Sequence, residues 1–186
     1  MNLKQIHQQA IVPALALLPA RMNSKEALVM LFAIGLQESK FEHRRQMGAG
    51  PARGFWQFER DGGTAGVLRH KSSHIYALAV CKQRGLTDLK EAELIKGHTP
   101  NSIVERAYHA FEHDDVLAAV FARLLLWTDP KALPVLGDVD GAFSLYIRTW
   151  RPGAYSRGTD QQRSELRVKF SRYYALALLE TGKCSA

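Results

Sequence analysis

The sequence predicts a mainly α-helical fold with at most a small β-hairpin beside a cleft. Three observations lead to this prediction: the apolar residues fall in runs of helical length, capping and terminating residues bound these runs, and strand signals are few. Only the aromatic segment 55–58 has the composition of a strand. With 186 residues, 46% of them apolar, we expect one domain spanning residues 1–186 with a substantial core.

The first two apolar segments are both expected to be helical. Segment 10–20 has the length of a signal-peptide core, but a single Lys precedes it and two prolines interrupt it, so we interpret it as a helix that packs in the core. Asn23 is predicted to cap the next helix, with Glu26 completing a capping box. Residues 27–36 are nearly all apolar, so this helix is expected to be buried on all sides. No apolar run reaches the ~20 residues that a membrane span needs.

Two further helices are predicted in the middle of the chain, each followed by a glycine. Residues 73–84 form one candidate, which Gly85 terminates, and residues 89–96 form another, which Gly97 terminates. Glycine commonly follows the last helical residue because it adopts the left-handed conformation without strain. For both helices, the following glycine therefore predicts where the helix ends.

The second half of the chain is predicted to hold two longer helices. Asp114 or Asp115 is expected to cap an apolar helix that runs through Trp127. Residues 153–158 are expected to form a flexible connection. Apolar residues at helical spacing then predict a last helix over residues 161–181.

Glu38 is the strongest candidate for a catalytic residue. It lies at the C-terminal end of the apolar helix, where partial desolvation and the negative end of the helix dipole both raise the pKa of a carboxyl group. A glutamic acid that keeps its proton near neutral pH can protonate the leaving oxygen of a glycosidic bond. The alternative is a solvated Glu38 paired with Lys40, Arg44 or Arg45.

A glycine-bracketed aromatic stretch follows Glu38 after a short loop. Its residues are, in order, Gly50-Pro51-Ala52-Arg53-Gly54-Phe55-Trp56-Gln57-Phe58. The glycines and the proline permit a tight backbone course, and aromatic rings beside a neutral amide are the mixture that binds sugars. On composition alone, a role for the aromatic residues in the core is at least as good an interpretation.

These motifs resemble a known family. Glu38-Ser39, a loop, and then Gly54-Phe55-Trp56-Gln57 resemble the soluble lytic transglycosylase and goose-type lysozyme group, whose helical domains cleave the glycan strands of peptidoglycan. Pro51 stands where that pattern has its first glycine, and Phe-Trp replaces its usual Leu-Met. Residues 117–125 resemble the family's central buried helix, and residues 141–146 resemble its later tyrosine-bearing segment.

The segment Trp150-Arg151-Pro152-Gly153-Ala154-Tyr155 is most similar to bacteriophage-encoded murein-degrading proteins, and the resemblance spans residues 31–155. It implies a lysozyme-like helical domain that cuts the β-1,4 bond between N-acetylmuramic acid and N-acetylglucosamine, with Glu38 as acid and then base. It implies no metal and no cofactor. The residues expected to line the glycan cleft are Ser39, Gly54, Gln57, Phe58, Tyr146, Arg148 and Arg151.

The resemblance allows two reactions. In the transglycosylases one glutamate suffices, because the substrate's own muramyl hydroxyl attacks and an anhydro-sugar forms without water. A hydrolase such as a muramidase or a chitinase-like endolysin normally needs a second carboxylate at roughly 5 to 9.5 Å. Glu59 and Asp61 could supply it, although solvated loop charges are the simpler reading of both. We therefore favour the lytic transglycosylase.

Two pairs of histidines have a spacing that zinc ligands use. His70 and His74 stand four apart, as do His109 and His113, a spacing that points both imidazoles to one side of a helix. Zinc-dependent wall amidases use histidines, but zinc also needs a third protein ligand and usually a catalytic Glu nearby. Glu112 would face away from the side of the helix that His109 and His113 share. We expect solvated or capping histidines and no metal.

The net charge of +7 suits an anionic partner, either peptidoglycan or nucleic acid. Arginines interleaved with aromatic residues in the last third of the chain support the rival function, a non-enzymatic helical nucleic-acid-binding module. These arginines are Arg148, Arg151, Arg157, Arg163, Arg167 and Arg172. We place Arg148 and Arg151 instead at the flanks of the cleft, where they would meet peptide carboxylates.

Bacterial peptidoglycan is the expected partner, with neither nucleic acid nor membrane, and the oligomeric state is left open. Cys81 and Cys184 lie far apart without metal-ligand spacing and are expected to be unpaired thiols. Without a convincing signal peptide, we expect synthesis in the host cytoplasm and action on the periplasmic cell wall, through holin release or as a virion component.

Overall fold

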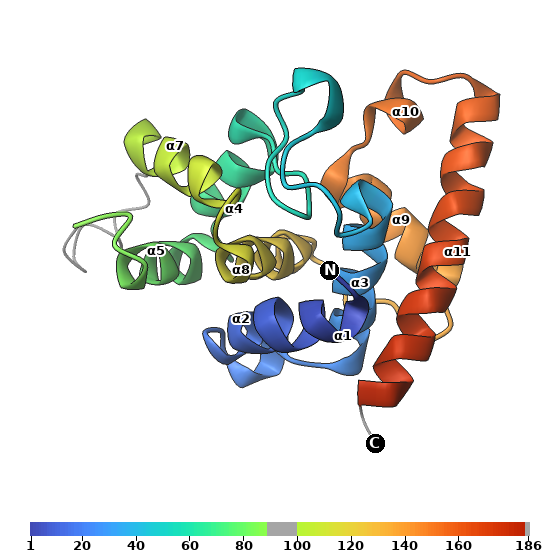
Figure 1. Ribbon diagram of the computed structural model, residues 1–186, viewed down its shortest axis with the longest axis horizontal. Helices are drawn as coiled ribbons and strands as arrows, with labels where there is room; N and C mark the ends of the chain where they lie inside the picture. Colours follow the sequence, from blue (N-terminus) through green and yellow to red (C-terminus); the bar gives the residue numbers. More distant parts are fainter. Residues whose placement is uncertain (89–99, 185–186) are drawn as a thin grey trace.

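The computed structural model describes residues 1–88 and 100–184, and this part of the chain is mainly α-helical with essentially no strands (Figure 1). The prediction of a mainly α fold is confirmed. Its helices are α1 Leu3–Ile6, α2 Val12–Ala16, α3 Lys25–Ser39, α4 Ala65–Arg69, α5 His74–Gln83, α7 Asn101–Ala110, α8 Asp115–Trp127, α9 Val139–Trp150, α10 Gly153–Ser156 and α11 Asp160–Cys184. None of the helices in these two ranges is long and apolar enough to cross a membrane.

Helix α8 lies at the centre of the fold. All its residues from Leu117 to Leu126 are buried, and α2, α3, α4, α5 and α9 each pack against it (Figure 1). Of the two aspartates predicted to cap it, Asp114 does so, since its Oδ1 accepts a hydrogen bond from the backbone N–H of Leu117 at 2.9 Å. The central buried helix was thus predicted with its start and its end.

Helix α3 is buried over nearly its whole length, as its apolar composition predicts. The predicted cap was wrong by one residue: Ser24, not Asn23, precedes the helix, and its Oγ accepts from the N–H of Ala27 at 3.2 Å. That shift removes the expected capping box with Glu26. Helix α11 runs along the outside of α3 (Figure 1) and covers the side that α8 leaves open.

Segment 10–20, helix α5 and the last helix follow the predictions, whereas α4, α7 and α9 form in segments for which no helix is predicted from the sequence. Segment 10–20 is largely helical, joined to α1 through a π turn at His7–Ile11, and contributes buried residues to the core. Helix α5 ends as predicted before Gly85, whose φ is +69°. The connection predicted at 153–158 contains the short helix α10, and the helix predicted at 89–96 lies outside the described residues.

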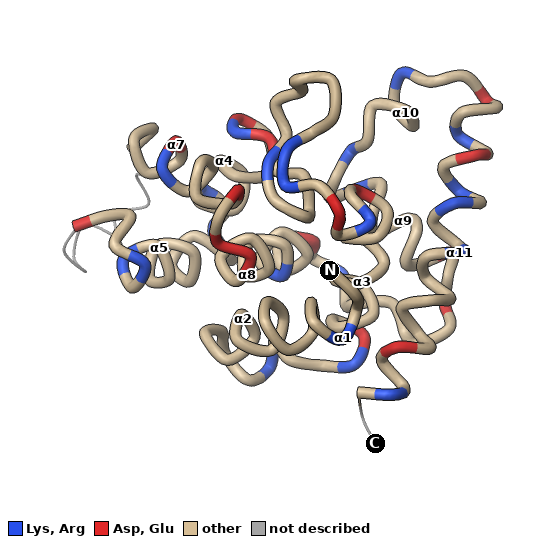
Figure 2. Tube along the Cα trace, in the orientation of Figure 1, with Lys and Arg blue, Asp and Glu red and all other residues tan. Residues whose placement is uncertain are grey.

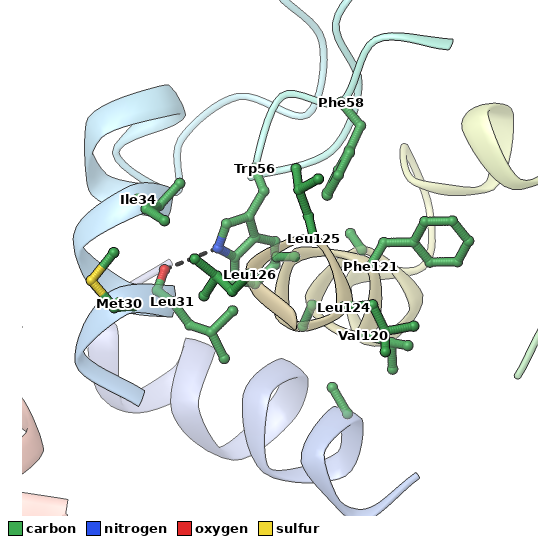
Figure 3. Close-up of a cluster of buried hydrophobic side chains, with 14 of the residues drawn as sticks. Met30, Leu31, Ile34, Trp56, Phe58, Val120, Phe121, Leu124, Leu125 and Leu126 are labelled. Atoms are coloured by element: carbon green, nitrogen blue, oxygen red, sulfur yellow. Dashed lines mark hydrogen bonds between the residues drawn. The ribbon is translucent and has the colours of Figure 1, made fainter. Parts of the chain in front are cut away.

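Segment 55–58 does not form the strand that its composition allowed. It makes only an isolated bridge, between Arg53 and Phe58, because the chain turns at Gly54 and Gln57, whose φ angles are +72° and +51°. The side chain of Trp56 enters the core between α3 and α8, where its Nε1–H donates to the carbonyl oxygen of Leu31 at 2.9 Å (Figure 3). Tertiary packing, rather than strand pairing, therefore holds this segment.

Candidate active site

A cleft of about 1420 Å³ opens between the loop after α3 and the segment that joins α9 to α10. The end of α3 and the end of α8 also contribute to its lining. The two walls are tied together where the indole N–H of Trp150 donates to the carbonyl oxygen of Trp56 at 2.9 Å. The cleft is large enough for several sugar rings.

Glu38, the predicted catalytic residue, lines this cleft from the last turn of α3. Its side chain is half-buried, neither walled off nor fully open to water. The arginines that could have paired with it are engaged elsewhere: Arg44 binds Asp115 and Arg45 binds Glu112. The alternative of a solvated, ion-paired Glu38 is therefore wrong with respect to these two arginines.

The pKa of Glu38 is raised from its ordinary value of 4.5 to about 7. Burial is the largest cause, because removing water disfavours the ionised form. The hydroxyl of Tyr146, which donates to Glu38 Oε1 at 2.6 Å, opposes this rise, as does the positive charge of Lys169. The negative charge of Glu59 adds to it. Near neutral pH the carboxyl group can therefore both give and take a proton.

Lys169 is a neighbour of Glu38 that sequence reasoning missed. It lies on α11, and its Nζ donates to the backbone carbonyl oxygen of Gln37 at 3.1 Å. Burial and the charge of Lys40 lower the pKa of Lys169, while Glu38 raises it. No motif could have pointed to it, since the contact joins residues 132 positions apart.

Tyr146→Phe should raise the pKa of Glu38 further. Without the phenolic hydroxyl, the ionised form of Glu38 loses a hydrogen bond and its pKa rises further above 7, by up to about one unit for a bond of this kind. The ring stays stacked on Phe170 at 5.1 Å, which keeps the core intact. The measurement is a titration of the Glu38 carboxyl group followed by NMR. Tyr155→Phe, an exposed tyrosine outside the cleft lining, is the matched control, and equal profiles for the two variants would contradict the assignment.

The other predicted cleft residues of the N-terminal half divide into two groups. Ser39 and Gln57 line the cleft, but both also hold the backbone: Ser39 Oγ donates to the carbonyl oxygen of Phe55 at 2.7 Å, and Gln57 Nε2 donates to that of Gly54 at 2.8 Å. Gly54 is not among the lining residues. A Cβ there would lie 3.0 Å from Phe111 Cβ, so its glycine is required by the turn and by close packing.

The aromatic residues of segment 55–58 belong to the core, so the predicted sugar-binding aromatic surface was wrong. Phe55, Trp56 and Phe58 are 1%, 0% and 2% exposed. Only Phe58 is among the lining residues, and its ring packs on Phe111 with centroids 5.1 Å apart. Their hydrophobic burial outweighs any value as a sugar platform.

Arg148 and Arg151 both line the cleft, as predicted, but they differ in charge balance. Arg148 Nε donates to Asp129 Oδ2 at 2.8 Å, and this pairing lowers the pKa of Asp129. Arg151 caps α9 with a φ of +50° and is exposed. The positive charge of Arg148 is therefore balanced by Asp129, whereas Arg151 has no such partner in the described part of the chain.

The two carboxylates considered for a hydrolase also line the cleft. Asp61 is paired with Arg60 at 2.8 Å. Glu59 is exposed and has no ion-pair partner among residues 1–88 and 100–184. Of the two, Glu59 has the freer carboxylate.

The histidine pairs make local contacts. His70 Nδ1 lies 2.8 Å from Ser72 Oγ, and His109 Nε2 lies 2.8 Å from Glu105 Oε1. Within residues 1–88 and 100–184, no group of three or more His, Cys, Asp or Glu side chains is arranged to hold a metal ion. Cys81 and Cys184 are free thiols, as predicted.

The arginines of the last third of the chain do not form a continuous basic face. In the first turns of α11 acidic and basic residues alternate, as Asp160, Arg163, Glu165 and Arg167 (Figure 2). Arg163 pairs with Asp160 at 2.7 Å, and Arg167 pairs with Asp140 from α9. This charge pattern does not favour the extended phosphate contacts of a nucleic-acid-binding module.

The chain was compared with protein-family models, curated proteins and solved structures, and none of them matches it.

Proposed function

We propose that the protein is a lysozyme-like, phage-type enzyme that cleaves peptidoglycan glycan strands between N-acetylmuramic acid and N-acetylglucosamine, as a lytic transglycosylase. One observation carries the proposal: Glu38 is half-buried in a cleft of about 1420 Å³, and its burial raises the pKa of the carboxyl group to about 7. A neutral carboxyl group in such a place is what a general acid for glycosidic bond cleavage requires.

In the proposed reaction Glu38 protonates the glycosidic oxygen as the bond to the muramyl C1 breaks. The resulting carboxylate then takes the proton of the muramyl hydroxyl, whose oxygen bonds to C1 and closes the anhydro ring. The proton returned to Glu38 restores the starting state, so one carboxyl group serves both steps. Tyr146, which donates to Glu38 Oε1, stabilises the carboxylate between them.

Hydrolysis is the second candidate, and the unpaired carboxylate of Glu59 on the cleft is the observation that favours it. A hydrolase would use Glu59 to activate water or to stabilise the positive charge that develops on the sugar. The nature of the product separates the two reactions, because only hydrolysis places a water oxygen at C1.

Digestion of purified sacculi, followed by mass analysis of the muropeptides, tests both candidates. We expect the wild type to release muropeptides with anhydro ends. Glu59→Gln should release them at no less than about one third of the wild-type rate, since the transglycosylase needs no second carboxylate. Reducing ends, together with a loss of ~100-fold or more in Glu59→Gln, would establish the hydrolase instead. Cut peptides on intact glycan would contradict both.

A further inference from the structure

Arginines line the cleft in excess of their acidic partners. The lining includes Arg45, Arg69, Arg148, Arg151 and Arg157. Arg45 forms an ion pair with Glu112, and Arg148 forms one with Asp129. Arg69 donates a hydrogen bond to a neutral amide oxygen at 2.6 Å. The ion pairs thus neutralise only part of the positive charge of the cleft.

Like Arg69, Arg151 and Arg157 have no acidic partner within residues 1–88 and 100–184; unlike Arg69, neither donates a hydrogen bond to another side chain there. Both belong to the wall formed by the end of α9 and by α10. The side chain of Arg151 is anchored where its Nε donates to the carbonyl oxygen of Arg148 at 3.3 Å. Two unpaired guanidinium groups therefore stand on one wall.

Glycine at position 153 gives Arg157 its place on this wall. A Cβ at Gly153 would lie only 2.7 Å from Arg157 Nη2, so the guanidinium group lies directly against the glycine backbone. A planar guanidinium group can bind a carboxylate through two parallel hydrogen bonds.

We propose that Arg151 and Arg157 form a carboxylate-binding subsite that recognises the peptide stems carried by the glycan strand. This inference rests on the proposed function, because it assigns the substrate of the same cleft. The free carboxylates of the stems are the anionic groups that an intact murein strand presents beside its sugars. Recognition of the stems would direct the enzyme to strands that still carry their peptides.

The remaining charges of the cleft favour isolated carboxylates over a polyanion. Glu59 and Asp61 lie on the same cleft, on the wall formed by the loop after α3. A nucleic acid, with one phosphate on every nucleotide, would place negative charge against these two carboxylates. A peptide stem carries only a few carboxylates at its end and can keep them near the arginines.

The test compares two substrates with the wild type and with Arg151→Gln/Arg157→Gln. One substrate is glycan strands with intact stems, and the other is the same strands after an amidase has removed the stems and freed the lactyl carboxylates. We expect the double variant to lose about tenfold in kcat/KM on strands with stems and less than about threefold on bare strands. Arg172→Gln, which removes an exposed charge outside the cleft lining, is the matched control.

Each other outcome overturns the subsite. Equal losses on the two substrates, or no loss on either, would show that the arginines do not read the stems. A larger loss on bare strands would assign them to the lactyl carboxylate. A soluble muramyl tetrapeptide gives a second measurement by calorimetry: its affinity should fall about tenfold in the double variant, whether or not the wild type cleaves glycan. Binding without cleavage would thus contradict the proposed function alone.

Gly153→Ala tests the same subsite without changing its charge. The added Cβ displaces the guanidinium group of Arg157, which is the far end of a flexible side chain, so the fold should tolerate the change. We expect a loss of about threefold in kcat/KM on strands with stems, smaller than the loss of the double variant because Arg151 remains. Activity equal to that of the wild type on this substrate would remove Arg157 from the subsite.

Discussion

Glu38→Gln is expected to abolish cleavage of glycan strands, with kcat/KM falling by roughly 10³- to 10⁴-fold. Glutamine keeps the size of the side chain and can still accept the hydrogen bond from Tyr146, but it can neither give a proton to the glycosidic oxygen nor take one from the muramyl hydroxyl. The measurement is muropeptide release from purified sacculi, with products separated by mass. A variant that retains a tenth of the wild-type rate would rule out Glu38 as the acid.

The stability of the same variant against pH shows whether the carboxyl group has the expected environment. Because the pKa of Glu38 is about 7 in the folded protein and its ordinary value is 4.5, the folded state binds the proton more tightly. The contribution of Glu38 to the free energy of unfolding should therefore fall as pH rises from about 4.5 to about 7, by roughly 3 kcal/mol. Glu38→Gln should lack this fall, so it should unfold at a higher urea concentration than the wild type at pH 8. Identical pH profiles would contradict the raised pKa.

Trp56→Ala is expected to destabilise the fold by about 3 to 5 kcal/mol. The indole ring is completely buried between α3 and α8, and truncation removes the hydrogen bond to the carbonyl oxygen of Leu31 and leaves a cavity (Figure 3). In a chain of this length, such a loss corresponds to a fall of roughly 10 °C in Tm. Thermal or urea unfolding gives the measurement.

Trp56→Phe separates a core role from a sugar-binding one. Phenylalanine keeps most of the apolar contacts, including those with Phe41, but loses the indole N–H. We expect a destabilisation of about 1 to 2 kcal/mol with activity retained at temperatures where the variant is folded. A variant that melted like the wild type but cleaved glycan much more slowly would restore Trp56 to the substrate surface.

Local patterns in the sequence predicted much of the helical fold. The apolar run 27–36 indicated a buried helix, and the neighbouring aspartates Asp114 and Asp115 indicated the start of the central helix α8. The same reasoning singled out Glu38, since a carboxyl group at the end of a buried helix must lose water in almost any compact fold. It failed for the aromatic segment 55–58, because composition does not tell which face of a turn is covered.

The sequence by itself determined where the buried helices α3 and α8 form and which carboxyl group is sheltered, because both depend on neighbours within a few turns of chain. Only the tertiary structure decided what surrounds that group: Tyr146 comes from 108 positions away on α9, and Lys169, on α11, binds the carbonyl oxygen of Gln37 from 132 positions away. It also decided which arginines of the cleft are ion-paired: Arg148 pairs with Asp129, whereas no acidic residue in the described part of the chain pairs with Arg151. Desolvation and ion pairing depend on distance in space, which the order of residues does not record.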